Sequence, residues 1–198
     1  EDKKTKLMND LQIHPEDFIF IFVGRLVGDK GINELVKAFS ELNITNIKLL
    51  LVGPLEADLD PLNFDTLEQI KSNPAIINVG FQNDVRPYFS IANALAFPSY
   101  REGFPNVVIQ AGAMGLPSIV TNINGCNEII IEDENGIIIP TKNVEILTQK
   151  MLKLVTDKNY YHHLKTNARL MIESRYEQSV VWNALLDEYN CLIKNLNR

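Results

Sequence analysis

The chain alternates short apolar runs with segments in which apolar and polar residues repeat at helical spacing. The apolar runs are rich in β-branched residues and have no polar face, which is typical of strands buried on both sides in a parallel sheet. They cover Phe18 to Val23, Ile47 to Val52, Ile76 to Val79, Ala94 to Phe97, Ser118 to Val120 and Gly136 to Ile139. We therefore predict six buried strands.

Amphipathic segments between these runs predict crossover helices. They cover Ile32 to Leu42, Phe64 to Ser72, Val85 to Ala92 and Val107 to Gly115. This alternation with short Gly and Pro punctuation is typical of a doubly wound, Rossmann-like α/β sheet. Beyond it the pattern is only helical, over Val144 to Thr156, Tyr160 to Glu173 and Glu177 to Leu196. No linker divides residues 1–198, so we expect one domain with a helical C-terminal tail.

The last predicted helix carries an apolar stripe close to the C-terminus. Its members are Val180, Val181, Trp182, Leu185 and Tyr189. We interpret this stripe as core packing in preference to a surface for a partner.

Composition and charge narrow the class of partner. The 198 residues carry 19 Lys and Arg against 25 Asp and Glu, a formal net charge of −6. This acidic balance argues against a general nucleic-acid or anionic-membrane surface, so a phosphate ligand must be held by local positive groups. No apolar stretch approaches the ~20 residues of a membrane helix. Cys126 and Cys191 lack metal-ligand spacing and favour a reducing, cytoplasmic location.

Basic residues follow the first predicted strand. Ligands of open α/β sheets bind beyond the carboxyl ends of the strands, where helix N-termini offer free N–H groups. Residues 24–31, Gly-Arg-Leu-Val-Gly-Asp-Lys-Gly, place a guanidinium and an ammonium there. Arg can grip a phosphate bidentately and Lys adds a mobile charge, so Arg25 and Lys30 are candidates for holding a diphosphate; a solvated turn is the alternative. The spacing fits neither a P-loop nor a dinucleotide fingerprint.

A second candidate segment, Glu102 to Gln110, follows the fourth predicted strand. Pro105 suits the first turn of a helix, so the turn from Glu102 to Asn106 would offer an anion unpaired N–H groups and the positive end of a helix dipole. Gln110 lies about one helical turn beyond Asn106 and is a polar residue in an apolar helix. A solvent-facing amide is the alternative interpretation of Gln110.

Four spaced blocks carry a resemblance to a known family. They are Gly24-Arg25-Leu26 with Lys30-Gly31, Gly80-Phe81 with Asp84-Val85, Pro98 to Val107, and Gly115 to Thr121. In this order they resemble the nucleotide-sugar-binding half of the family-four retaining glycosyltransferases, which have the two-domain GT-B fold. The resemblance runs from about Phe18 to the C-terminus.

The resemblance implies roles for particular residues. Arg25 and Lys30 would hold the donor diphosphate and act in catalysis with Glu102, the first acid of the family's E-x(7)-E motif, which faces the transferred sugar. The residues implied in donor binding are Gly24, Phe81, Asp84, Gly103, Phe104, Pro105, Asn106, Val107 and Gln110. No metal or other cofactor is expected. Asp58-Leu59-Asp60 imitates a metal-binding D-x-D sequence but lacks the flanks of that motif.

The sequence also departs from the family. Gln110 stands at the second acidic position of the motif, where Glu usually accepts hydrogen bonds from ribose hydroxyls; Gln keeps one acceptor and adds donors. Asn93 stands where Asp is common, and Asn124-Gly125 replaces a usual Gly-Gly pair. The family's enzymes have a further N-terminal domain that binds the acceptor. Because this sequence begins at Glu1 without Met, we expect an excised C-terminal half that does not transfer sugar by itself.

The function implied by the resemblance is retaining transfer of a sugar from a UDP- or GDP-sugar to an acceptor, in bacterial surface polysaccharide or lipopolysaccharide synthesis. The expected partners are the donor and, through the absent N-terminal domain, a glycan or lipid-linked acceptor. No nucleic acid is expected, and contact with the inner face of the membrane is expected only through that absent half. Two alternatives stay open. One is a nucleotide-sugar epimerase of similar fold, disfavoured by residues 102–105, and the other is a non-catalytic nucleotide-binding module.

Overall fold

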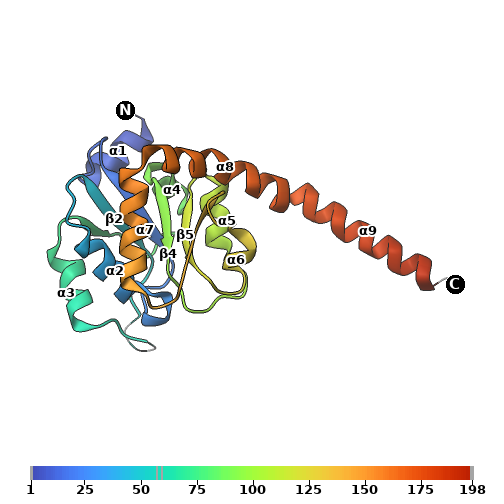
Figure 1. Cartoon of the computed structure of the whole chain (residues 1–198), viewed down its shortest axis with the longest axis horizontal. Helices are drawn as coiled ribbons and strands as arrows, with labels where there is room; N and C mark the ends of the chain where they lie inside the picture. The colour runs from blue at the N-terminus through green and yellow to red at the C-terminus, as the bar shows by residue number, and fades with distance from the viewer. Residues whose placement is uncertain (1, 57, 59, 197–198) are drawn as a thin grey trace.

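Six parallel strands form one sheet in the order β3-β2-β1-β4-β5-β6. The structure is a computed structural model and describes residues 2–56, 58 and 60–196. The strands are β1 (Phe18–Val23), β2 (Ile47–Val52), β3 (Ile76–Asn78), β4 (Ala94–Phe97), β5 (Ser118–Thr121) and β6 (Gly136–Ile139). The predicted doubly wound, Rossmann-like sheet of six strands is confirmed (Figure 1).

Burial on both faces of the sheet explains why its strands are continuously apolar. In β1, Ile19, Phe20, Ile21 and Phe22 are each at most 1% exposed, although successive side chains of a strand point to opposite faces. Helices must therefore cover both faces. The helix α2 (Ile32–Glu41) packs against α3 (Phe64–Ser72) and α7 (Val144–Thr156), whereas α5 (Asn106–Ala113) packs against α8 (Lys158–Tyr176).

The strand order reverses at the centre of the sheet, where β1 has β2 on one side and β4 on the other. Phe20 pairs with Leu49 of β2 and with Ala94 of β4. In a doubly wound sheet such a reversal leaves a crevice outside the carboxyl ends of the two central strands, because their connections leave in opposite directions. The loops that follow β1 and β4, which contain Lys30 and Glu102, therefore meet at this crevice.

Three short or polar elements were not predicted. They are α1 (Lys3–Asp10), the single 3₁₀ turn η1 (Gly28–Lys30) and α6 (Cys126–Ile129). The helix α1 has no buried residue, and the other two are about one turn long, so none has an apolar stripe that a sequence pattern could reveal. The remaining helix of the sheet region is α4 (Arg86–Ile91). None of the described helices combines the length and apolarity needed to cross a membrane.

The interpretation of the C-terminal stripe as core packing is wrong. The last helix, α9 (Gln178–Leu196), extends away from the sheet beyond the end of α8 (Figure 1). Trp182 is 60% exposed, and Val180, Val181, Leu185 and Tyr189 are exposed as well. The periodicity correctly predicted a helix with an apolar face, but α8 is the helix that packs on α5, and the apolar face of α9 is left exposed.

A close approach between two loops fixes the geometry behind the crevice. Gly31 has a positive φ of 71°, and a Cβ at this position would overlap the carbonyl oxygen of Pro98 at the end of β4. The amide of Tyr100 donates to the carbonyl oxygen of Asp29 at 2.9 Å, which ties the same two loops together. Gly31 therefore allows η1 to lie directly against the loop that follows β4.

We expect Gly31→Ala to lower the free energy of unfolding by about 3 kcal/mol or more, because it combines left-handed strain with backbone overlap. Gly115→Ala is the matched control, because Gly115 has a φ of 78° and open space at its Cβ position. That control should cost only the strain, about 1–2 kcal/mol. Urea unfolding of both variants measures the difference, and equal losses would contradict the proposed tight contact.

Candidate functional site

Lys30 and Glu102 meet at the crevice between β1 and β4. Lys30 ends η1, and Glu102 lies in the loop that leads from β4 to α5. The Lys30 ammonium donates to Glu102 Oε1 at 2.6 Å, and the two side chains are only 16% and 15% exposed. The structure thus brings together two of the three residues predicted to be catalytic, as a largely desolvated ion pair.

Arg25, the third of these residues, also contacts a carboxylate. Its Nη1 lies 3.0 Å from Glu56 Oε2, in a more exposed pair with side-chain exposures of 46% and 31%. Glu56 follows β2, and the backbones of Leu26 and Leu55 form a parallel bridge that holds the two loops side by side. Sequence reasoning missed Glu56. The available signal was an acidic residue in the exit loop of the strand that neighbours β1.

The loop that carries Lys30 is held in place by Asp60. The Asp60 carboxylate accepts the backbone N–H of Asp29, and the Asp60 carbonyl oxygen accepts the N–H of Gly28 at 3.1 Å. Asp60 therefore supports η1 from the neighbouring loop. Within the described residues no three His, Cys, Asp or Glu side chains are arranged to hold a metal ion, and Leu59 of the D-x-D sequence lies outside those residues.

Further acidic groups gather around Tyr100. Burial raises the pKa of Tyr100 well above its usual range, and the neighbouring Glu34, Asp60 and Asp29 raise it further. Arg101 donates two hydrogen bonds to Asp29 Oδ2, each of 3.2 Å. The side chain of Asp29 is thus directed to Arg101, which leaves the Lys30 ammonium to Glu102.

The N-terminus of α5 offers free backbone donors beside Glu102. Pro105 is buried and occupies the N-cap position, one residue before the first helical turn in which it was expected. No side chain caps the helix, and in the described part of the chain the N–H groups of Asn106 and Val107 have no acceptor. Such groups at the positive end of a helix dipole favour an anion.

The loop before α5 is supported from behind. Phe104 is 45% exposed and packs edge-on against Tyr176 of α8, with ring centroids 5.7 Å apart. A Cβ on Gly125 would overlap the carbonyl oxygen of Gly103, whereas the Cβ position of Gly103 itself faces open space. Phe104 and Gly103 therefore position the backbone of this loop.

The residues predicted to lie near a base and a ribose line two pockets that share Val85. Phe81, 67% exposed, borders a pocket of about 300 Å³ together with Gly24 and Arg25. Gln110 and Asp84 border a second pocket of about 440 Å³. Hydrogen bonds from Arg86 hold the pKa of the Asp84 carboxyl at about 2. The predicted residues thus fall into three groups along one edge of the sheet.

A comparison with protein families identifies the family of the chain. The model of the family described as glycosyl transferases group 1 matches residues 3–171. The chain belongs to this family. The match includes every residue predicted for the site, because these lie between Gly24 and Gln110.

Known relatives of this group 1 domain agree with that assignment. A capsular polysaccharide biosynthesis glycosyltransferase of Staphylococcus aureus, CapM, is 32% identical over 98% of this chain and 50% of its own length. The structure of HepE from Anabaena in complex with UDP and glucose superposes with a TM-score of 0.82 at 19% identity, over 96% of this chain and 52% of HepE. The C-terminal domain of the group 1 protein LpcC from Francisella tularensis gives a TM-score of 0.77 at 22% identity, over 90% and 94% of the two chains.

The coverage of these relatives is unequal. The chain spans about half the length of CapM and of HepE, but nearly all of the LpcC C-terminal domain. At these identities the two solved structures establish the likeness of the fold, and the sequence match establishes the family.

A buried thiol lies next to the central ion pair of the group 1 domain. Cys126 begins α6, directly after Gly125, and is fully buried. The pKa of the Cys126 thiol is raised to about 12, mainly by burial and also by the negative charge of Glu102, whereas Lys30 opposes the rise. The thiol is therefore neutral at physiological pH.

This raised pKa predicts a loss of stability at alkaline pH. Between pH 9.0, the ordinary thiol value, and about 12, the unfolded chain releases the Cys126 proton and the folded chain retains it. Stability should thus fall with rising pH in this window, by up to about 1.4 kcal/mol per pH unit from this one group. Cys126→Ala should make the slope shallower by that amount in urea unfolding, whereas Cys191→Ala, at an exposed position, should not. Equal slopes in the wild type and Cys126→Ala would contradict the shift.

Proposed function

We propose that this chain is the donor-binding domain of a retaining glycosyltransferase that transfers a sugar from a UDP- or GDP-sugar in the synthesis of a bacterial surface polysaccharide. The observation that carries the proposal is the Lys30–Glu102 pair beside the open N-terminus of α5. Membership of the group 1 family supports transfer, the similarity to CapM supports a polysaccharide product, and the similarity to HepE supports a UDP-linked donor.

The donor would lie along the carboxyl edge of the sheet. Arg25, Lys30 and the free N–H groups of Asn106 and Val107 would bind the diphosphate, because they are the cationic and donor groups at the crevice. Phe81 and Asp84 would lie near the base and Gln110 at the ribose. The remaining proposed contacts of the donor come from two loops, at Gly24 after β1 and at Gly103, Phe104 and Pro105 before α5.

Donor binding requires an exchange of partners in this structure. Lys30 is held by Glu102 and Arg25 by Glu56, so a diphosphate must compete with two carboxylates. Once Lys30 turns to the phosphate, Glu102 is released to face the transferred sugar. The binding energy of the phosphate contacts is thereby reduced by the cost of breaking the two pairs.

The chemistry follows from where charge develops. When the bond between the anomeric carbon and the phosphate oxygen breaks, its electron pair moves to the diphosphate, and Arg25, Lys30 and the N-terminus of α5 would stabilise the added negative charge. The acceptor oxygen would then attack the anomeric carbon from the face that the diphosphate leaves, which gives retention. Glu102 would lie against the sugar as positive charge develops on it.

The acceptor would be a glycan or lipid-linked sugar bound by a separate N-terminal domain of a longer enzyme. In this proposal the enzyme works in the cytoplasm, and contact with the inner face of the membrane is made through that other domain. The 198-residue chain would accordingly bind the donor without transferring its sugar.

The test of the diphosphate site is titration calorimetry with UDP in excess chelator. Lys30→Gln should weaken UDP binding by roughly 1.5–3 kcal/mol, the range for a charge-assisted hydrogen bond, and leave uridine binding unchanged. Glu102→Gln should have the opposite effect: it should tighten UDP binding by up to about tenfold, because Lys30 is no longer paired with a carboxylate. Lys37→Gln, on α2 away from the crevice, is the matched control. Loss of UDP binding in chelator, or equal weakening of UDP and uridine by Lys30→Gln, would overturn this arrangement.

Gln110 provides a separate test at the ribose. Gln110→Glu should preserve or strengthen UDP binding within about tenfold, because a carboxylate can accept from both ribose hydroxyls where the amide oxygen accepts from one. The gain is opposed by repulsion from the diphosphate, which Arg25 and Lys30 partly screen.

The specificity of this effect is measured with 2′-deoxy-UDP. The same substitution should weaken binding of 2′-deoxy-UDP relative to UDP, since one hydroxyl is missing. Equal effects of Gln110→Glu on the two nucleotides would show that Gln110 does not contact the ribose.

A further inference from the structure

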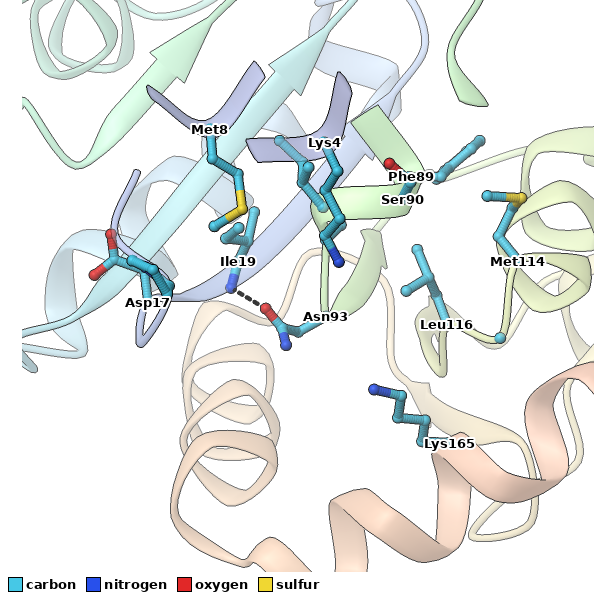
Figure 2. Close-up of a pocket in the computed structure, with 14 residues that line it drawn as sticks. Lys4, Met8, Asp17, Ile19, Phe89, Ser90, Asn93, Met114, Leu116 and Lys165 are labelled. Carbon is cyan, nitrogen blue, oxygen red and sulfur yellow. Dashed lines mark hydrogen bonds between the residues drawn. The ribbon is translucent and has the colours of Figure 1, made fainter. Parts of the chain in front are cut away.

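A cavity of about 340 Å³ lies at the opposite edge of the sheet from the proposed donor site. Its walls come from α1, from the start of β1, from the segment between α4 and β4, from the end of α5 and from α8 (Figure 2). Ile19 is the second residue of β1 and Asn93 precedes β4, so the cavity lies at the amino ends of these two strands. The proposed donor loops follow their carboxyl ends.

Two lysines from distant parts of the chain line this cavity. Lys4 belongs to α1 and Lys165 to α8, and their ammonium groups point into the same space in Figure 2. Lys165 lies 5.6 Å from the ring centroid of Tyr161. Within the described residues neither lysine forms an ion pair with a carboxylate, in contrast to Arg25 and Lys30. The cavity therefore has two ammonium groups that are not paired with a described carboxylate.

The orientation of Asn93 adds a third donor. The amide of Ile19 donates to Asn93 Oδ1 at 2.8 Å, so the oxygen of this carboxamide faces β1 and its NH₂ group is directed away from Ile19 (Figure 2). The Asn93 backbone is fixed too, because its N–H donates to the Ile19 carbonyl and its carbonyl oxygen accepts from Tyr161. The NH₂ group thus has a fixed position.

The carboxylate among the described lining residues, Asp17, does not neutralise these groups. Asp17 is 6% exposed, and its Oδ2 accepts the backbone N–H of His14 at 2.8 Å. Figure 2 shows Asp17 at the far end of the cavity from Lys165. Opposite the donors the wall is apolar, formed in part by Phe89, Met114 and Leu116.

We propose that this cavity binds a small organic phosphate monoester. Such a group carries a charge close to −2 at neutral pH and several acceptor oxygens, which match two ammonium groups and one amide NH₂. The cavity has room beyond the phosphate, and its apolar wall would take a compact apolar substituent. The cavity shares Phe89 and Met114 with the pocket that borders Gln110, but its lysines, Asn93 and Met8 border neither pocket of the proposed donor site.

Methionine methyl NMR tests the proposal on the wild-type chain. The protein has 4 Met residues, of which Met8 and Met114 line the cavity and Met151 and Met171 do not. With UDP present to fill the proposed donor site, inorganic phosphate at constant ionic strength should shift the Met8 resonance and leave Met151 and Met171 unchanged. Met8 is the diagnostic resonance, because Met114 also borders the pocket of Gln110. Failure of UDP to bind would count against the donor site alone, since Met8 borders the cavity and neither pocket of the proposed donor site.

Three variants sharpen the test, with phenyl phosphate as a second probe. Lys4→Gln and Lys165→Gln should each weaken phosphate binding roughly 10- to 100-fold. Asn93→Asp keeps the acceptor for Ile19 but places a carboxylate beside the lysines, and should abolish binding with the thermal transition of the fold retained. Lys158→Gln, on the same helix as Lys165, is the control and should bind as the wild type does.

Two results would overturn the proposal. One is the absence of a phosphate-dependent shift at Met8 in the wild type, and the other is an unchanged Met8 response in folded Asn93→Asp. Phenyl phosphate should bind more tightly than inorganic phosphate because its ring would cover the wall at Phe89 and Met114. Equal affinities would overturn the organic part of the assignment.

Discussion

The candidate site depends on how closely the loop after β1 approaches the loop after β4. Lys30 and Glu102 are separated by 72 positions in sequence, and their 2.6 Å contact exists only because η1 lies against the end of β4. Gly31 permits that approach, since any side chain there would overlap Pro98, and the hydrogen bond from Tyr100 to Asp29 secures it. The reversal of strand order supplies the crevice, but these backbone contacts determine which side chains meet inside it.

Charge compensation would allow an acidic chain to hold the proposed diphosphate site. The net charge of −6 gives no general attraction for anions, and the cations at the crevice are individually paired with Glu56 and Glu102. A ligand must offer more than one negative charge and a fitting geometry to displace both carboxylates. In the proposed site the pairing would favour diphosphates over single anions, and Glu102 would stay in contact with Lys30 until a donor binds.

The sheet was predictable because strands that are buried on both faces have continuously apolar sequences. Phe18 to Val23, for example, has no polar position. The cations Arg25 and Lys30 were also predictable from local sequence, because they follow that strand directly and therefore lie at its carboxyl end. Their carboxylate partner Glu56 was not, because the Arg25–Glu56 contact exists only after β1 and β2 pair. The prediction for the stripe on α9 was wrong for a different reason. Periodicity indicates that a helix has an apolar face, but it carries no information about what covers that face.

The two ends of the central strands are held by different chemistry. At the carboxyl ends the loops meet through the close contact at Gly31 and through the Lys30–Glu102 ion pair, of which only the ion pair could exchange partners with a ligand. At the amino ends Asn93 joins β1 to β4 by side-chain and backbone hydrogen bonds to Ile19, and Tyr161 of α8 donates to its carbonyl oxygen. Because every acceptor of Asn93 is engaged, only its NH₂ group remains to meet a ligand. Asn93 can therefore join β1 and β4, where the strand order reverses, and still contribute a hydrogen-bond donor to the cavity between Lys4 and Lys165.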